Sequence, residues 1–238
     1  LFRAAFGGTY NAAFYIQNVD ASLASITIKY YDSLGTLTCS STDTVASQAS
    51  KGYWLPSTCV PNNWVGGAVV TSDKNIVAIA RPHIGAEVMT YNSFSSGSLT
   101  SYVPMLFKAA FGGTYNAAFY VQNVGTSLAD ITIQYYDSTG TLTCSSTDTV
   151  ASLASKGYWL PSTCVPTNWV GGAVVTSTQP IVTVGRPHVG SQITTYNGFS
   201  SGSASSYIPM LFKNAYGGTY NAAFYIQNVG ASPAAITI

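Results

Sequence analysis

Hydrophobic and polar positions alternate with a period of two along most of the chain. From Tyr10 to Val19, the residues Ala12, Phe14 and Ile16 fall on one side of an extended backbone, and the residues between them fall on the other. The same alternation runs from Ser25 to Tyr31. Successive side chains of a β-strand point to opposite faces, so this period indicates half-buried strands. Because no stretch keeps the spacing of an amphipathic helix, the pattern predicts an all-β protein.

Turn-forming residues divide the pattern into short strands. Further strands are predicted over residues 36–45, 52–55, 68–71, 76–80, 87–93 and 102–109, with a long loop over 56–67. The turn Ser72–Asn75 predicts a hairpin between the strands at 68–71 and 76–80. Seven or eight short strands in a unit of about 105 residues are typical of an antiparallel β-sandwich, Ig-like or jelly-roll-like.

The whole pattern recurs with a period of 105 residues. The segment Leu1-Phe-Arg-Ala-Ala-Phe-Gly-Gly-Thr-Tyr returns, with few changes, from Leu106 and again from Leu211. We therefore divide the chain into repeat 1 (1–105), repeat 2 (106–210) and the truncated start of repeat 3 (211–238). The true boundary can fall near 102–110 and 207–215. Since both ends fall in mid-pattern, we expect the chain to be a window on a longer array.

The start of the third copy lacks the strands that would cover it. Residues 219–238 predict only two strands, and a lone hairpin is marginally stable in water. A following segment or a neighbouring identical chain would then have to bury Phe224, Ile226 and Ile236, for example by strand addition.

The segment that joins one copy to the next is apolar rather than Gly/Ser-rich. An exposed apolar connector is unfavourable in water, so we expect it to pack on a module as a strand. Pro104 restricts that strand to an edge or a connecting position. The predicted junction residues are Tyr102, Pro104, Leu106 and Phe107, and, in the next copy, Tyr207, Pro209, Leu211 and Phe212.

Composition narrows the range of partners. Only 7% of residues are charged, whereas soluble domains average about a quarter. The net charge is +1 and the nine basic residues are scattered, so there is no basic patch for nucleic acid. No apolar run approaches the roughly 20 residues of a membrane helix, so no membrane span is expected in this segment.

Each full copy contains two cysteines, Cys39 and Cys59 in the first and Cys144 and Cys164 in the second. An even number in a neutral, Ser/Thr-rich module predicts a disulfide within each module and an oxidising compartment. Free buried thiols and bridges between copies or chains are the alternatives. A zinc site is disfavoured, because the spacing is not that of zinc ligands and each copy has one histidine.

The sequence offers little for catalysis. His83 and His188 follow Arg-Pro, and either would need a serine and a carboxylate in space to form a hydrolytic triad. Asp32 and Asp43 are the candidate carboxylates for such a triad in the first copy. We expect instead that the histidines make ordinary structural contacts. A Lys–Asn isopeptide bond is disfavoured because its candidate donors, Lys51 and Lys156, follow polar residues and should be exposed. No phosphate loop, calcium loop or paired carboxylates occur, so we expect no enzyme and no cofactor.

Two tryptophans in each copy raise an alternative function. Exposed Trp54 and Trp64, with the many tyrosines, could stack on sugars and serve a glycan-binding surface. We expect instead that Trp54 lies in the core and that Trp64 covers the loop over the disulfide.

Four segments of the repeat resemble a known family. They are Thr9–Asn18, Ile26–Asp32, Gly66–Ser72 and Tyr102–Phe107. They are similar to the tandem β-sandwich repeats of large secreted or cell-surface bacterial proteins. The resemblance covers the whole repeat and implies a sandwich fold and an extracellular or cell-surface location. Its motifs are structural and carry no active-site residue or ligand to this chain.

These observations favour a structural function. A chain of like modules is quasi-one-dimensional, with stability set within modules and at their junctions. We expect a component of an extracellular filament, pilus-like fibre or surface stalk, with the neighbouring modules as its partners. A multivalent adhesin that binds surface glycans is the alternative.

Overall fold

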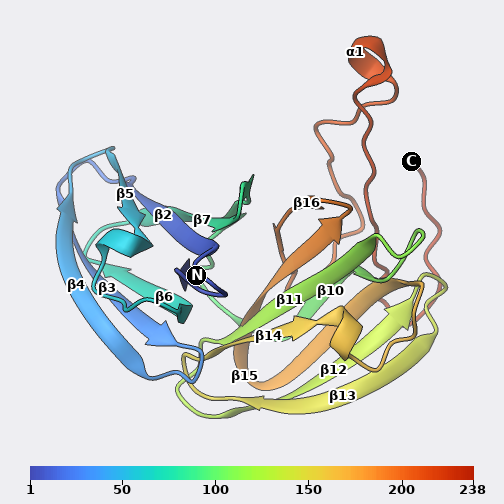
Figure 1. The fold of residues 1–238 in the computed structure, drawn as a ribbon, viewed down its shortest axis with the longest axis horizontal. Helices are drawn as coiled ribbons and strands as arrows, with labels where there is room; N and C mark the ends of the chain where they lie inside the picture. Colours follow the sequence, from blue (N-terminus) through green and yellow to red (C-terminus); the bar gives the residue numbers. More distant parts are fainter.

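A computed structural model describes residues 1–238 as two β-rich units, followed by an extended C-terminal segment (Figure 1). All named strand pairs are antiparallel, as the alternating pattern predicts. Helix is limited to two 3-10 turns, η1 (Leu55–Ser57) and η2 (Leu160–Ser162), and the short α1 (Ala215–Gly218). The protein is therefore all-β.

The first unit contains two sheets. One has the order β1-β6-β3-β4, from β1 (Phe2–Arg3), β6 (Trp64–Ser72), β3 (Ala24–Asp32) and β4 (Leu37–Val45). The other has the order β5-β2-β7-β8, from β5 (Ser50–Trp54), β2 (Tyr10–Asn18), β7 (Ile76–Ile84) and β8 (Glu87–Val88), with β9 (Tyr91–Asn92) also on β7.

The second unit repeats this arrangement, except that one long strand, β15, replaces the two strands β6 and β7. β15 (Trp169–Val189) pairs through its first half with β12 (Ala129–Asp137) and through its second half with β11 (Tyr115–Asn123). The remaining strands are β10 (Ser98–Lys108), β13 (Leu142–Val150), β14 (Ser155–Trp159), β16 (Gln192–Ile193) and β17 (Tyr196–Asn197). Because β15 takes part in both layers, its backbone hydrogen bonds join them into one continuous sheet path.

The predicted hairpin between residues 68–71 and 76–80 is wrong. Those residues lie in β6 and β7, and β6 pairs with β3 whereas β7 pairs with β2. In the second unit the equivalent residues form the single strand β15. Alternation indicates which face of a strand each side chain occupies, but it does not determine which strand lies alongside. The turn-like residues 72–75 are therefore compatible with a hairpin between β6 and β7 and also with the observed pairing of each strand with a different partner. The strand also begins at Trp64, inside the predicted loop.

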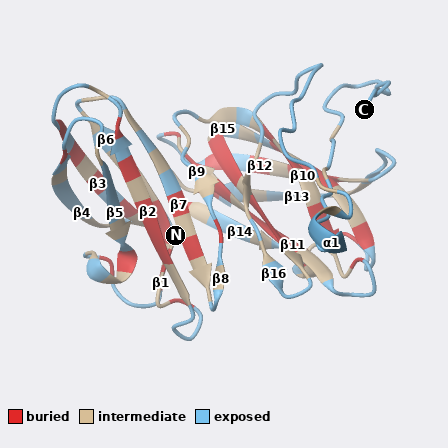
Figure 2. Ribbon diagram, turned by 90° about the horizontal axis from the view of Figure 1, so that it is seen from above, coloured by how far each residue is buried: buried red, intermediate tan, exposed pale blue.

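Each unit has its own hydrophobic core. The core of the second unit draws Phe119, Ile131, Tyr135 and Trp169 from strands on both sides of the unit. The first unit has the corresponding cluster, with Phe14, Ile26, Tyr30 and Trp64 among its members. In β2 and β3 these are the inward positions of the alternating runs, so the period of two places one apolar face of each of these two strands against the core (Figure 2).

The C-terminal segment from residue 200 onward forms no β-strand and is largely exposed, drawn in pale blue in Figure 2. Ile226 and Ile236 are more than half exposed, and Phe224 is half-buried. The two strands predicted over residues 219–238 therefore do not form, and the expectation that further strands would cover these side chains stays a prediction.

Candidate functional site: the contact between the two copies

The apolar connector is a strand of the second unit. β10 pairs with the first half of β15, in a register that sets Tyr102 opposite Val174 and Phe107 opposite Val170. Leu106 and Phe107 are fully buried. β10 starts at Ser98, so the structural unit begins before the boundary counted from Leu1. In the first unit, the equivalent of the last part of β10 is β1, which pairs with Trp64 and Val65 of β6.

Pro104 lies at an irregularity of this strand. The register of β10 against β15 shifts between Val103 and Leu106, as expected for a strand that carries a proline. The hydroxyl of Tyr196 donates a hydrogen bond to the carbonyl oxygen of Met105 at 3.0 Å and accepts one from its N–H at 3.0 Å. One side chain thus satisfies both backbone groups that the bulge removes from the ladder.

The second predicted junction is arranged differently. Tyr207, Pro209, Leu211 and Phe212 belong to the exposed C-terminal segment, where Tyr207 is 93% exposed. Phe212 packs edge-on against Tyr216 and Tyr220 within the same segment. The structure therefore places only the first set of predicted junction residues between two folded units.

The two units also touch directly. Phe2 of the first unit packs edge-on against Tyr120 of the second, with ring centroids 6.2 Å apart. Gly67 faces Gln122 so closely that a Cβ on Gly67 would lie 2.6 Å from the Gln122 Nε2 atom. A Cβ on Gly35 would collide with the carbonyl oxygen of Ser152. The missing side chains of these glycines allow the units to approach.

The same contact recurs one period later. Phe107 packs edge-on against Tyr225, with ring centroids 5.7 Å apart, and Gly172 faces Gln227. The Gln227 side chain also donates a hydrogen bond to the Ala173 carbonyl at 3.4 Å. Each partner lies 105 residues after its counterpart in the first contact. The start of the third copy therefore meets the second unit as the second unit meets the first.

Two basic side chains, Lys156 and Arg186, line the space between the units. The Arg186 guanidinium lies over the Tyr120 ring at 5.2 Å from its centroid. Burial raises the pKa of the Tyr120 and Tyr225 hydroxyls above their ordinary value, and burial raises the pKa of Tyr91 to about 12. These tyrosines are therefore neutral at physiological pH, and apolar packing and neutral hydrogen bonds hold the contact.

Three hydrogen bonds join residues that occupy the same position in the two copies. The Asn92 N–H donates to Asn197 Oδ1 at 3.1 Å, and Asn197 Nδ2 donates to the Asn92 carbonyl at 2.8 Å. Thr195 Oγ1 donates to the Thr90 carbonyl at 2.8 Å.

None of these residues is predicted from the sequence, because a contact between copies leaves no local pattern of hydrophobic and polar positions. The same holds for Tyr120 and Gln122, which face the first unit. The glycines kept at equivalent positions of both copies are the available signal.

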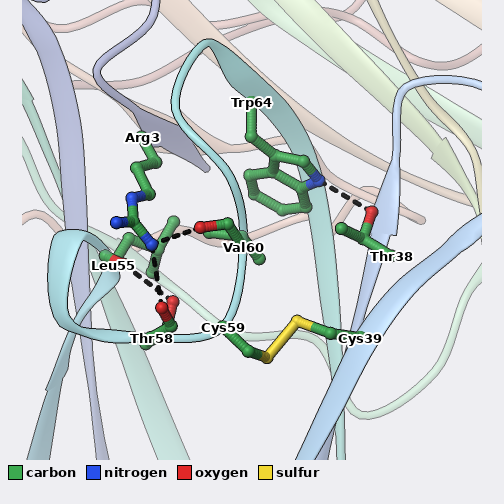
Figure 3. Close-up of a disulfide and its surroundings, with 8 residues drawn as sticks. All are labelled: Arg3, Thr38, Cys39, Leu55, Thr58, Cys59, Val60 and Trp64. Carbon is green, nitrogen blue, oxygen red and sulfur yellow. Dashed lines mark hydrogen bonds between the residues drawn. A yellow bond between two sulfur atoms is a disulfide. The ribbon is translucent and has the colours of Figure 1, made fainter.

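Both predicted disulfides are present, Cys39–Cys59 and Cys144–Cys164. Each ties the edge strand of a sheet to the long loop beyond the 3-10 turn (Figure 3). Around the first bridge, Trp64 Nε1 donates to Thr38 Oγ1 at 2.9 Å, and Arg3 donates to the carbonyls of Thr58 and Val60. Disulfides persist in oxidising compartments, so the bridges indicate a non-reducing environment.

The expectation for Trp54 is wrong, whereas Trp64 is buried near the disulfide as expected. Trp54 is 40% exposed and Trp159, its equivalent, is 39% exposed. The alternation continues through Tyr53, which faces the core beside Phe14, and so turns the next side chain outward. Trp54 packs edge-on against His83 at 5.4 Å, and Trp159 packs against His188 at 5.2 Å.

The acids considered for chemistry make structural contacts. Asp43 pairs with Lys51 at 2.6 Å and accepts a hydrogen bond from Tyr53, and Asp148 pairs with Lys156 at 2.7 Å. Asp32 accepts hydrogen bonds from the backbone of its own turn. No group of three or more His, Cys, Asp or Glu side chains is placed to share a metal ion. No helix has the length and apolar character needed to cross a membrane.

No protein-family model and no curated protein matches the chain. Among solved structures, the chain is similar to the crystal structure of Thermotoga maritima 1070, with 16% sequence identity and a TM-score of 0.38. That match covers 44% of this chain and 96% of the other.

Proposed function

We propose that the protein is a structural component of an extracellular filament, pilus-like fibre or surface stalk built from tandem β-sandwich modules. The observation that carries this proposal is the connection between copies. The connector forms β10, which pairs with β15 in the sheet of the second unit. The two units pack against each other around Phe2 and Tyr120. A connection of this kind transmits orientation from one module to the next, as a stalk or fibre requires.

The sandwich assignment and the location are parts of the same proposal. The sandwich assignment is supported by the core cluster of each unit, which draws its members from strands of more than one sheet or sheet segment. One disulfide in each module suits secreted and cell-surface modules, because bridges survive there. The partners are the neighbouring modules of the chain, with identical chains added by strand pairing.

Imaging of the native material tests the proposed function. Electron microscopy of the source cells and their secreted fraction, with an antibody raised against this chain, should label fibres or stalks with a regular spacing. Labelling confined to dispersed single molecules, or to the cell interior, would contradict the proposal.

A glycan-binding adhesin is the second candidate, because the structure exposes one tryptophan in each copy. Trp54 and Trp159 present equivalent half-exposed rings, each held by a histidine, and such rings can stack on sugars. Binding to a glycan array should then be lost in the double variant Trp54→Ala/Trp159→Ala. It should persist in Phe6→Ala/Phe111→Ala, which removes aromatic rings that are 65% and 58% exposed elsewhere. Equal binding by both variants would exclude the tryptophans as the sugar platform.

A further inference from the structure

The outer edge of β9 is capped by a side chain of the next copy. β9 pairs with β7 on one side, where Tyr91 lies opposite Ala80 and Asn92 lies opposite Ile79. On the other side, the Asn92 N–H and carbonyl both bond to the amide of Asn197. Unpaired N–H and C=O groups on an edge strand would otherwise be available to any extended chain. The Asn197 side-chain amide therefore occupies this edge, accepting one hydrogen bond from the Asn92 N–H and donating one to the Asn92 carbonyl.

The two partners hold the same position in successive copies, and this constrains how the copies are related. When one rotation plus translation carries each copy onto the next, equivalent points lie close together only near the rotation axis. Asn92 and Asn197 are within one side chain of each other, as are Thr90 and Thr195. The other contacts join different positions: Phe2 meets Tyr120, which is the equivalent of Tyr15. The copies are thus rotated about a line beside β9 and β17.

We propose that successive copies of the repeat are related by one recurring screw operation whose axis runs beside Thr90–Asn92 and Thr195–Asn197. Along this axis, the asparagine of each copy caps the backbone of the same asparagine in the copy before it, forming an amide ladder. The partner that this surface recognises is the next copy of the same repeat. The inference rests on the proposed function and deepens it by giving the array a defined superhelical form.

The second contact supports a recurring operation. Phe107 and Gly172 meet Tyr225 and Gln227 as Phe2 and Gly67 meet Tyr120 and Gln122, which is a head-to-tail contact that repeats in the same sense. Head-to-tail contacts that do not close into a ring propagate as helices.

The ladder has a direction, and this supplies a matched control. Asn197 and Thr195 use their side chains, whereas Asn92 and Thr90 offer only backbone atoms. The double variant Asn197→Ala/Thr195→Val should therefore remove all three bonds between the copies. The double variant Asn92→Ala/Thr90→Val should remove none of them, although it changes the same residue types at equivalent positions.

Hydrogen exchange of the residue-92 amide, followed by NMR in the 238-residue chain, tests the ladder. In Asn197→Ala/Thr195→Val this amide should exchange up to about tenfold faster, since a hydrogen bond contributes roughly 0.5–1.5 kcal/mol. In the control variant its protection factor, which corrects for the changed side chain at residue 92, should equal that of the wild type. Unchanged exchange in the first variant, or equal acceleration in both, would overturn the ladder. Native exchange in the core strands β2 and β11 shows that either variant is folded.

Small-angle X-ray scattering of the same proteins tests the single screw operation. The wild-type chain should scatter as two units in one fixed arrangement, and Asn197→Ala/Thr195→Val should have a larger radius of gyration. A wild-type profile that requires freely reorienting units would overturn the inference. Both measurements use the isolated chain, so their failure leaves the proposed fibre to be judged by imaging. Absence of fibres would contradict the function without affecting the measured contact.

Discussion

His83 and His188 hold the same position in the two copies, and each lies against a tryptophan and near an arginine of its own unit. Burial, and then the nearby Arg186, lower the pKa of His188 to about 4. Burial and Arg81 also lower the pKa of His83. The Nε2 atom of each ring is buried without a hydrogen-bond partner, so protonation would place a charge where no acceptor is available.

A proton titration of the two histidines tests these pKa shifts. By NMR, His188 should titrate near pH 4, and His83 should titrate below the ordinary value of about 6.5. Because the folded-state pKa of His188 is depressed, its stabilising effect is fully present above pH 6.5. The effect is lost as the pH falls toward 4, so the free energy of unfolding should decrease over that window. Two identical titration curves near the ordinary value would contradict the packing described for both rings.

At the scale of the element, β10 depends on a side chain from a distant strand. Pro104 and the register shift beside it interrupt the ladder with β15, and the Tyr196 hydroxyl restores both bonds at Met105. Tyr91 is the equivalent residue of the first copy, and the counterpart of Met105 would precede Leu1. The connector is thereby fixed by the unit that follows it.

Tyr196→Phe should accordingly destabilise the second unit by about 1–3 kcal/mol, because it leaves a buried N–H and carbonyl without partners. Tyr91→Phe is the control and should change the free energy of unfolding much less. Urea denaturation followed by tryptophan fluorescence measures both. Equal losses in the two variants would show that the bonds to Met105 contribute nothing specific.

Individual strands are more predictable from the sequence than their partners are. Alternation locates β2 and β3 closely, because each has one apolar face against the core. It fails at β6 and β7, where a turn-like spacer suggests a hairpin although the chain passes from one layer to the other. The prediction also fails at Trp54. Its hydrophobicity suggests burial, but it follows the inward-facing Tyr53 in the strand, so its side chain points outward.

At the scale of the whole molecule, stability comes from cores, disulfides and the contact between units rather than from ion pairs. The two salt bridges, Lys51–Asp43 and Lys156–Asp148, are both substantially exposed and contribute little. The candidate site itself is only partly predictable. Its connector is apolar and therefore visible in the sequence, but its facing residues are polar or small and meet only after two units have folded.

Reduction of the disulfides should lower the free energy of unfolding by about 3 kcal/mol for each bridge, since each closes a loop of 20 residues. Thermal denaturation with and without a phosphine reductant measures the effect. The variant Cys39→Ala/Cys59→Ala should respond to the reductant only through its second unit. Intact mass under non-reducing conditions should show no free thiol, and four free thiols would contradict the bridges.

The position of the bridge within each unit also sets how far the array can lengthen when it is pulled. Cys39 and Cys59 are 20 residues apart in sequence, a stretch that would span roughly 70 Å if drawn out fully. The bridge holds their Cα atoms 6.2 Å apart, so roughly 60 Å of chain stays withheld in every repeat even after its sheets have come apart. Under tension, each unfolded repeat would therefore extend by roughly 60 Å less with its bridge intact than with the bridge reduced, so the reach of the array would depend on the redox state of its surroundings.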